Sequence, residues 1–408
     1  MADAVEELPQ SYKKAKFAIF LTLFTAGVGN SFVFAVLQPL GREIGLREIQ
    51  IGSIISISAT VFMFSAPVWG RKSEKWGRKP IIIFALCAYC ILTLCFGTTI
   101  KMGLAGLLPV SVIWVMLIFF RATFSATIGG MFPCSQAYMA DITTPKERTA
   151  GMALVGISSG LGMISGPIMA AVASRVSPTF PFYVVAGLAV VAAIVARRYI
   201  IEAPARPQSE HHDNAPFMKW QLIPFLMTST IMMMSLASMQ MANGFYLQDK
   251  FSLSELATTQ HTGGVMMASA LASISAQLLM VQRLRLAPKT LMRLGFPFVL
   301  TGVTLFTISP TYPFMLAAMG CFGFGMGMIM PGNIAALSMS VGNHQQGKMA
   351  GISTASNGLG FIAGPMLGSG LYTEEFPHLP YMVAIGLVFT ATFLVWVVAR
   401  FPEHTQET

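Results

Sequence analysis

Long apolar runs separated by short polar segments dominate the sequence. A helix needs about 20 apolar residues to cross the hydrocarbon core of a bilayer, and runs close to this length recur along the whole chain. In lipid every backbone polar group must find a partner within the protein, which favours helices. We therefore predict an all-α polytopic membrane protein with twelve transmembrane helices, at residues 17–38, 49–70, 80–98, 110–138, 150–173, 180–197, 222–247, 260–281, 292–309, 312–338, 349–372 and 379–400.

One long polar segment, near residues 201–219, interrupts the middle of this pattern. It lies between the sixth and seventh predicted spans and contains three prolines and two adjacent histidines. It divides the spans equally, so we predict two six-helix bundles joined by a linker. The expected parts are an N-terminal tail at 1–16, a bundle at 17–198, the linker at 199–219, a second bundle at 220–400 and a C-terminal tail at 401–408.

A short sequence occurs twice, at an offset of 198 residues: residues 159–169 read SGLGMISGPIM and residues 357–367 read NGLGFIAGPML. The repeated small residues and prolines are Gly160, Gly162, Gly166 and Pro167, which return as Gly358, Gly360, Gly364 and Pro365. Glycines at this spacing let a neighbouring backbone approach a helix closely. The alternative is a generic small-residue packing face. Because the two stretches align without a gap, we interpret them as a duplication, which is a common plan among transporters.

Composition and charge support a membrane protein. Hydrophobic residues make up 54% of the chain and charged residues 11%, whereas soluble domains carry roughly 25% charged residues. The net charge of +9 does not indicate nucleic acid, because the basic residues gather in alternate loops, as the positive-inside rule describes. This pattern places both termini in the cytoplasm. The sparse, outer side holds Arg42, Arg47, Lys101, Arg175 and Lys250.

The loop between the second and third spans, residues 70–80, reads GRKSEKWGRKP. It resembles the signature loop of the major facilitator superfamily, in which Gly70, Glu74, Lys75, Gly77 and Arg78 occupy the characteristic positions. This chain departs from the pattern in having Glu instead of Asp at 74 and Lys instead of Arg at 75. The alternative is a solvated basic turn that only fixes topology.

The resemblance implies that this loop latches the two halves together on the cytoplasmic side. Its acid would face the positive end of the eleventh helix. The next cytoplasmic loop offers charged partners, Asp141 and Arg148. The Gly-Pro segment of span five resembles the family's antiporter motif, although Ala170 and Ala171 replace the usual glycines.

Taken together, these stretches look most similar to the twelve-helix drug/proton antiporter branch, which includes tetracycline exporters. This resemblance implies the major facilitator fold and a monomer in the bacterial inner membrane that acts on small molecules. It implies no cofactor, with the proton gradient as the energy source, and no metal. We find no catalytic constellation and expect no enzyme activity.

In this fold the substrate path runs between the halves, so polar and flexible residues of the lining spans are candidates for it. Arg121 is the one basic residue inside a span, where a charge normally faces a cavity or a partner; the alternative is that it extends to the interface. The other candidates can equally be explained by interhelical hydrogen bonds or core packing. The candidate substrate residues are Arg121, Asn30, Phe34, Gln38, Ser125, Met239, Gln240, Asn243, Tyr246, Asn333 and Asn357.

No acid falls near the middle of a predicted span, although proton-coupled carriers usually bury one. The first hypothesis is a proton-coupled exporter of small amphipathic compounds that works by alternating access, with the proton on a peripheral acid such as Asp249. The alternative is a carrier for an anionic metabolite, for example a carboxylate siderophore, whose charge would pair with Arg121. A more remote alternative is a non-transporting receptor on the same fold.

Overall fold

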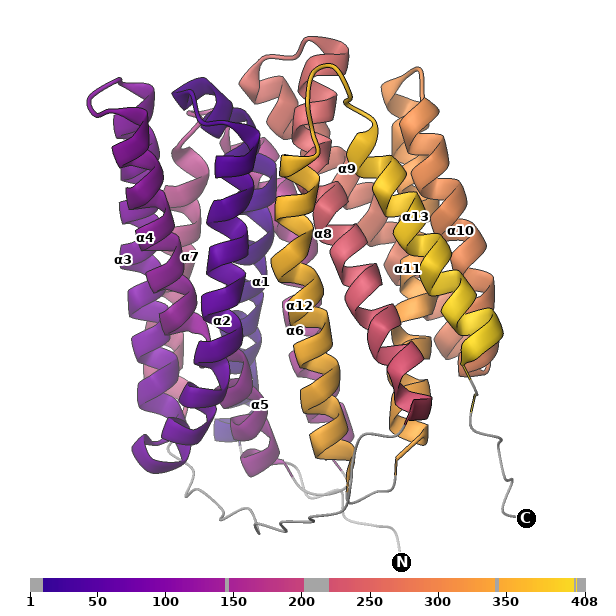
Figure 1. Cartoon of the computed structure of the whole chain (residues 1–408). Coiled ribbons are helices and arrows are strands. Elements are labelled where there is room, and N and C mark those ends of the chain that lie inside the picture. Colours follow the sequence, from indigo (N-terminus) through magenta and orange to yellow (C-terminus); the bar gives the residue numbers. More distant parts are fainter. Residues whose placement is uncertain (1–9, 144–146, 202–219, 342–344, 400, 402–408) are drawn as a thin grey trace, which may run out of the picture. The chain divides into compact units, whose positions relative to one another are not determined.

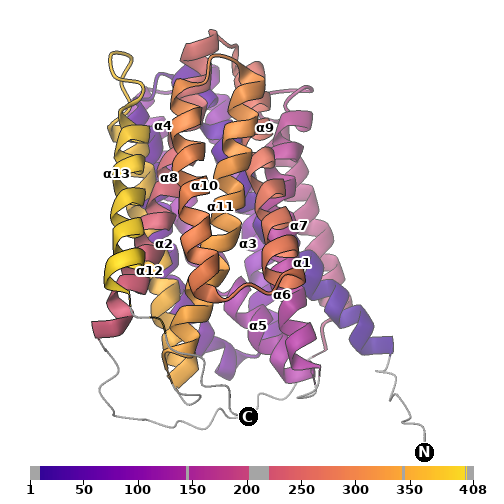
Figure 2. The same ribbon diagram turned by 90° about the vertical axis from the view of Figure 1, so that its right-hand side faces the viewer.

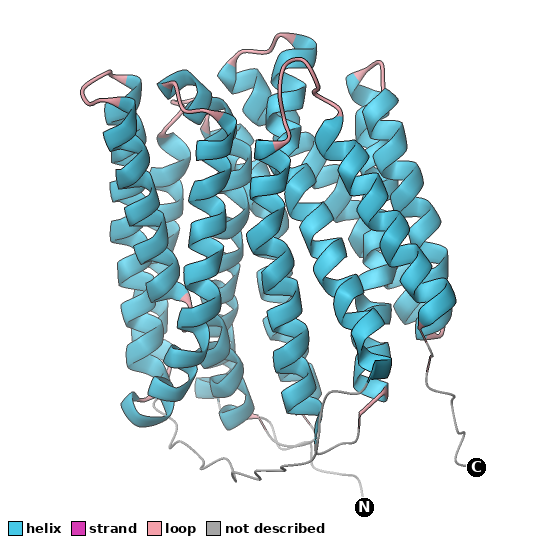
Figure 3. Cartoon of the chain, in the orientation of Figure 1, coloured by secondary structure: helices cyan, strands magenta, loops and turns pink. Residues whose placement is uncertain are grey.

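The computed structural model describes residues 10–143, 147–201, 220–341, 345–399 and 401. Within these ranges the regular elements are helices, and no strand occurs (Figure 3). Each of the twelve predicted spans falls on a helix or on two consecutive helical segments. The prediction of an all-α membrane protein is confirmed for the described residues.

The helices of the first half are α1 (Gln10–Ile44), α2 (Glu48–Trp76), α3 (Arg78–Leu104), α4 (Val110–Ile128), α5 (Met131–Ile142), α6 (Arg148–Ala173) and α7 (Phe180–Tyr199) (Figure 1). The helical segments of the second half are η1 (Trp220–Leu222), α8 (Ile223–Phe251), α9 (Glu255–Ala276), η2 (Gln277–Arg283), α10 (Pro288–Ile308), α11 (Tyr312–Met339), α12 (Gln346–Gly370), α13 (Leu379–Phe393) and η4 (Leu394–Val398). Many of them extend beyond the predicted spans, because hydropathy marks only the part of a helix that lies in hydrocarbon.

Among the described residues, eleven spans are long and apolar enough to cross a membrane. One of these spans combines α4 and α5, and others include the short segments η1, η2 and η4. The remaining helix, α12, has 25 residues but is richer in Gly, Ser and Asn than its neighbours. Its small and polar residues explain why hydropathy singles it out less clearly.

Contacts between residues divide the chain into two compact units. Unit 1 comprises Met1–Gly45 and Ile57–Glu210, and unit 2 comprises Leu46–Ser56 and His211–Thr408. The first turns of α2 therefore belong to unit 2. There Gly52 fits against α12 so closely that a Cβ atom at this position would lie 2.7 Å from the carbonyl oxygen of Pro365.

The two units have the same internal packing. In unit 1, α1 packs along α6 and α7, and α3 packs against α4 and α7. In unit 2, α8 packs along α12 and α13, and α10 packs against α11 and α13 (Figure 2). The pairs correspond one to one when α1 is matched with α8, α3 with α10, α6 with α12 and α7 with α13. Each unit thus repeats one helix arrangement, as the duplicated sequence leads us to expect.

The repeated glycines form close backbone contacts in two of these helix pairs, α6 with α1 and α12 with α8. A Cβ atom on Gly162 of α6 would overlap the carbonyl oxygen of Phe24 and lie 2.9 Å from the Cα atom of Gly27, both on α1. A Cβ atom on Gly360, the repeat equivalent in α12, would likewise overlap the carbonyl oxygen of Thr230 on α8. Backbone therefore touches backbone in each unit, which only glycine permits.

The third glycine of the repeat makes the same kind of contact about one turn further along. A Cβ atom on Gly166 would lie 2.7 Å from the carbonyl oxygen of Val28, and one on Gly364 would lie 2.7 Å from that of Met234. Gly160 is different, because a Cβ atom there would meet nothing within 4 Å. The prolines that follow the motif, Pro167 and Pro365, lie inside their helices and do not end them.

The fourth span is divided into α4 and α5 at Gly129 and Gly130. Pro133 has no N–H group to donate to the preceding turn, so the hydrogen-bond ladder is weakest here. The missing side chains also let α2 approach, because a Cβ atom on Gly130 would lie 2.7 Å from that of Trp69. The indole of Trp69 donates a hydrogen bond of 2.6 Å to the carbonyl oxygen of Ala126 on α4.

These contacts predict that Gly162 is far less tolerant of substitution than Gly160. The Gly162→Ala variant should lose about 1–3 kcal/mol of stability, because the added methyl group overpacks a backbone contact. The matched variant Gly160→Ala should stay close to the unmodified protein. Thermal unfolding of the purified variants in detergent measures the difference, and equal unfolding midpoints for the two variants would contradict the packing described.

Candidate functional site

Arg121 lies on α4 in the interior of unit 1, with only 7% of its surface exposed. The carbon at the centre of its guanidinium is 4.7 Å from the ring centroid of Phe124, a cation–π contact. Its Nε atom is buried and has no hydrogen-bond partner among the described residues. Arg121 also forms no ion pair with any of the described residues. The arginine is buried in the protein and does not extend to an exposed surface.

The surroundings of Arg121 are mostly aromatic, with a few aliphatic residues and one threonine. It borders a narrow cavity of about 10 Å³, which is room for about one water molecule. Around it Phe182 packs edge-on against Phe32 with ring centroids 5.2 Å apart, and Tyr89 packs against Phe124 at 4.9 Å. The residues that line the cavity are Phe32, Val33, Leu92, Thr93, Phe96, Phe120, Arg121, Phe124 and Phe182.

A buried charge without a partner is costly, so such a group is normally paired. The nearby hydroxyl of Tyr89 donates to the carbonyl oxygen of Thr25 on α1 at 3.1 Å, and the described acids lie elsewhere. The guanidinium offers five N–H donors in a planar fork that suits a carboxylate or phosphate. The site thus combines an unpaired set of N–H donors with apolar and aromatic side chains.

The other candidates in unit 1 differ in their surroundings. Phe34 and Gln38 are buried, and Asn30 is partly buried on the same helix, α1. The Ser125 hydroxyl lies 2.6 Å from that of Ser58, so it joins α4 to α2. This contact matches the alternative explanation for Ser125, an interhelical hydrogen bond.

In unit 2, two asparagine candidates also form hydrogen bonds between helices. Asn333 of α11 donates to the carbonyl oxygen of Phe225 at 3.0 Å and to the Ser229 hydroxyl at 2.7 Å, both at the start of α8. Asn243 accepts a hydrogen bond of 3.0 Å from the Tyr381 hydroxyl of α13. These partners were missed at the sequence level, because nothing in the spacing indicates which helices become neighbours.

Tyr246 donates to the carbonyl oxygen of Thr307 on α10 at 3.0 Å. Met239 is buried on α8, and Gln240 next to it is partly buried. Asn357 of α12 is partly buried, and its amide oxygen has no hydrogen-bond partner among the described residues. Within each unit, several of the candidates join neighbouring helices through hydrogen bonds. Their contact with substrate stays a prediction.

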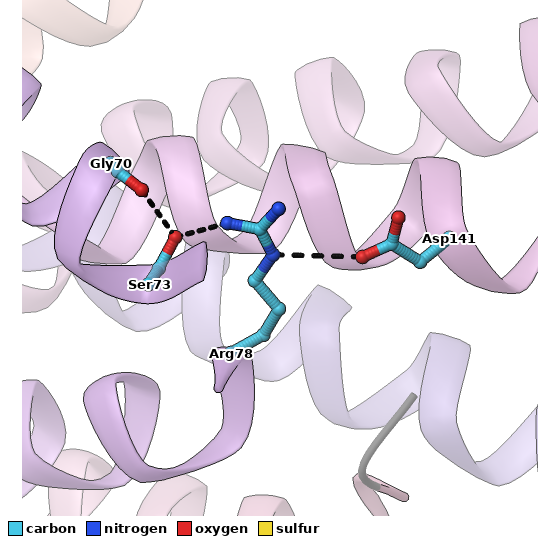
Figure 4. A network of polar contacts seen from close by, with 4 residues as sticks. All are labelled: Gly70, Ser73, Arg78 and Asp141. Carbon is cyan, nitrogen blue, oxygen red and sulfur yellow. Dashed lines mark hydrogen bonds and ion pairs between the residues drawn. The ribbon is translucent and has the colours of Figure 1, made fainter. Parts of the chain in front are cut away.

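The predicted latch loop contains a buried polar network in unit 1 (Figure 4). The Ser73 hydroxyl donates to the carbonyl oxygen of Gly70 at 2.6 Å, and the guanidinium of Arg78 donates to the same hydroxyl. Arg78 also pairs with Asp141 of α5, with its Nε atom 3.5 Å from a carboxylate oxygen. The two charged side chains are only 7% and 13% exposed. The network ties the end of α2, the start of α3 and the end of α5 together.

Local backbone geometry positions this network. Gly77 has φ 87°, a left-handed conformation that glycine adopts without strain, and it lets α3 begin one residue later at Arg78. Lys75 is exposed. The side chains of Glu74 and Arg148 lie outside the described part of the structure. Ser73 was not predicted, although it lies within the recognised loop.

These observations define a polytopic helical membrane protein whose two units repeat one packing arrangement around buried polar groups. The chain matches the family model of the Major Facilitator Superfamily over residues 19–280 and 225–408, and it belongs to that family. It is a transporter and not an enzyme. The fold class and the family resemblance predicted from the sequence are both confirmed.

Relatives match over nearly the whole chain. Multidrug resistance protein 2 of Bacillus subtilis is 25% identical, with 94% of this chain and 96% of that protein covered. The class D tetracycline resistance protein of Salmonella ordonez is 24% identical over 89% of this chain and 90% of its own. Among solved structures, a bacterial homologue of the human lysosomal transporter Spinster matches with a TM-score of 0.72 at 12% identity, with 95% of this chain and 94% of that chain covered.

The Arg78–Asp141 pair yields a test. Removing one partner leaves the other charge buried and unpaired, so Arg78→Gln should cost about 3–5 kcal/mol of stability. The control Lys75→Gln, at an exposed position of the same loop, should change stability by less than about 0.5 kcal/mol. Thermal unfolding in detergent reports both effects.

A double variant checks the pairing itself. Arg78→Gln combined with Asp141→Asn should be less destabilised than the sum of the two single variants, because neither charge is left alone. Strict additivity would show that the two side chains do not interact.

Proposed function

We propose that this protein is a proton-coupled exporter of small amphipathic organic compounds that works by alternating access. The observation that carries the proposal is that this chain aligns over nearly its whole length with multidrug resistance proteins and with tetracycline resistance proteins. Similarity over a whole chain of this length, including both halves, is what a shared transport cycle requires. The aromatic surroundings of Arg121 add a compatible chemistry, because apolar and aromatic walls with few polar groups suit drug-like ligands.

The proposal includes a location and an organisation. The distribution of basic residues favours the bacterial inner membrane with both termini in the cytoplasm. Two bundles at 17–198 and 220–400 are joined by the linker at 199–219, and the division of contacts near residue 210 supports this boundary. The protein works as a monomer, needs no cofactor, and takes its energy from the proton gradient.

A second candidate is transport of an organic anion, which the state of Arg121 favours. Its guanidinium is buried and lacks an acidic partner among the described residues. A substrate carboxylate would supply the missing charge through a charge-assisted hydrogen bond. In that case the positive charge of Arg121 attracts the anionic substrate and repels cationic compounds.

Transport by proteoliposomes distinguishes the two candidates. Liposomes with an imposed pH gradient are presented with a lipophilic cationic dye, a neutral drug and a polycarboxylate, and proton movement is followed with an internal pH indicator. The exporter proposal predicts proton movement with the dye or the drug. Proton movement with the polycarboxylate alone would favour the second candidate, and none with any compound would contradict proton coupling.

Variants at Arg121 make this test specific. If the substrate is an anion, Arg121→Gln should abolish its transport and Arg121→Lys should retain part of it, because lysine keeps the charge but not the planar fork. If the substrates are cations, Arg121→Gln should leave transport intact or raise it. The control is Lys101→Gln, an exposed basic position at the end of α3.

A further inference from the structure

Unit 2 contains a second polar site, distant in sequence from the motifs, where α8 ends and α13 begins. A cavity of about 560 Å³ opens there. On the proposed topology it faces the outside of the cell. Its lining residues are Tyr246, Gln248, Asp249, Lys250, Ser252, Tyr372, Glu374, Pro377 and His378. The site brings an ammonium, an imidazole and two carboxylates to one aqueous opening.

Lys250 carries a fixed positive charge into this cavity. Its ammonium donates to the Tyr246 hydroxyl at 3.1 Å and to the carbonyl oxygen of Ser309, the residue after α10. The ammonium also lies 5.0 Å from the centroid of the Tyr246 ring. All three contacts are with neutral groups, so none of them cancels the charge.

His378 lies next to this charge, immediately before α13. Its ring packs edge-on against Tyr246, with the centroids 5.3 Å apart. The Nδ1 atom is buried and has no hydrogen-bond partner among the described residues. Burial, and then the positive charge of Lys250, lower the pKa of His378 below its usual value. Both effects favour the neutral imidazole, which can accept a proton.

The other charged and titratable groups around His378 come from three elements. From α8, Asp249 accepts a hydrogen bond of 2.7 Å from the Tyr372 hydroxyl, in the segment that follows α12. Glu374 of the same segment is exposed. From α13, Tyr381 packs against Tyr246 with ring centroids 5.2 Å apart. Helix α10 contributes backbone carbonyl groups here.

We infer that His378 is a proton-binding group of the transport cycle, loaded from the outer aqueous phase and controlled by the neighbouring ammonium of Lys250. The inference rests on the proton coupling proposed above and names the residue that performs it. Within the described spans no acid lies near the middle of a helix, so a peripheral group has to take this role. The proton comes from water and returns to water, and no other reactant is needed.

The direction of the effect follows from charge. A proton on His378 places two cations side by side, which this arrangement disfavours. Because the folded protein then binds the proton more weakly than the unfolded chain, stability falls as pH decreases below about 6.5. A conformation that moves the imidazolium away from Lys250 and toward Asp249 or Glu374 would bind the proton better. The proton therefore shifts the equilibrium toward that conformation, which is the coupling step.

The test uses the full-length protein in proteoliposomes and measures two fluxes of a transported dye. One flux is driven by a pH gradient, and the other runs down the dye's own gradient at equal pH. His378→Gln should reduce the gradient-driven flux and its proton movement to the level of protein-free liposomes while the downhill flux remains. The matched control is His261→Gln, because that histidine lies at the start of α9 with its ring against Tyr312 and outside the cavity.

Two further measurements test the inference, and the first of them does not depend on the folding of His378→Gln. Lys250→Gln removes the neighbouring charge, so the pH midpoint of gradient-driven transport should move upward. In detergent, the loss of thermal stability between pH 7.5 and 5.5 should be smaller for His378→Gln than for the unmodified protein.

The outcomes separate this inference from the proposed function. If the unmodified protein moves no protons with any substrate, the proposed proton coupling fails. If it does and His378→Gln moves protons equally well, the role of His378 is overturned. An unchanged pH midpoint in Lys250→Gln would also overturn it.

Discussion

The contact of backbone with backbone between one pair of helices in each unit is the constraint on which the rest of the structure depends. Lipid is as apolar as a leucine side chain, so close packing and hydrogen bonds have to hold membrane helices together. Glycines at 162 and 166 bring α6 against α1, and glycines at 360 and 364 bring α12 against α8. Helices α1 and α8 are also the most buried of the described spans that hydropathy identifies. Helices α7 and α13 pack against the same two helices, α1 and α8.

Unit 1 contains two buried arginines whose surroundings differ. Arg78 has an acidic partner, Asp141, and a serine hydroxyl at hydrogen-bond distance. Its charge is therefore satisfied by the protein itself and stabilises the junction of three helices. Arg121 has aromatic rings around it and no acid among the described residues. The first charge is satisfied within the protein, whereas the Nε atom of the second has no hydrogen-bond partner among the described residues.

Unit 2 distributes its polar groups differently. Neutral side chains such as Asn243 and Asn333 join its helices inside the unit, while the titratable groups Lys250 and His378 line a cavity at one end of the unit. A duplicated fold has thus acquired two distinct chemistries, a buried cation in one copy and a titratable cluster in the other. Under the functions proposed here, substrate selection and proton binding are assigned to different units.

Some features of the fold follow from local sequence, and others depend on tertiary contacts. Hydropathy locates the spans, because crossing a bilayer demands long apolar runs wherever the helices later pack. The repeated Gly-Pro segment indicates close packing and duplication for a similar reason, since only glycine admits a neighbouring backbone. The break at Gly129 and Gly130 was not predicted, because it depends on both local glycines and the approach of α2.

The candidate site was less accessible from the sequence. The sequence does not show whether a polar residue in a span faces a cavity or a neighbouring helix. The roles of Ser125, Asn243 and Asn333 could therefore not be assigned from it. Ser73, Tyr381 and His378 gain their importance only from partners on other helices. The sequence by itself determined the membrane class, the number of spans and the position of the family motifs, because these follow from local composition. Only the tertiary structure decided which polar groups meet, because that depends on which helix faces become neighbours.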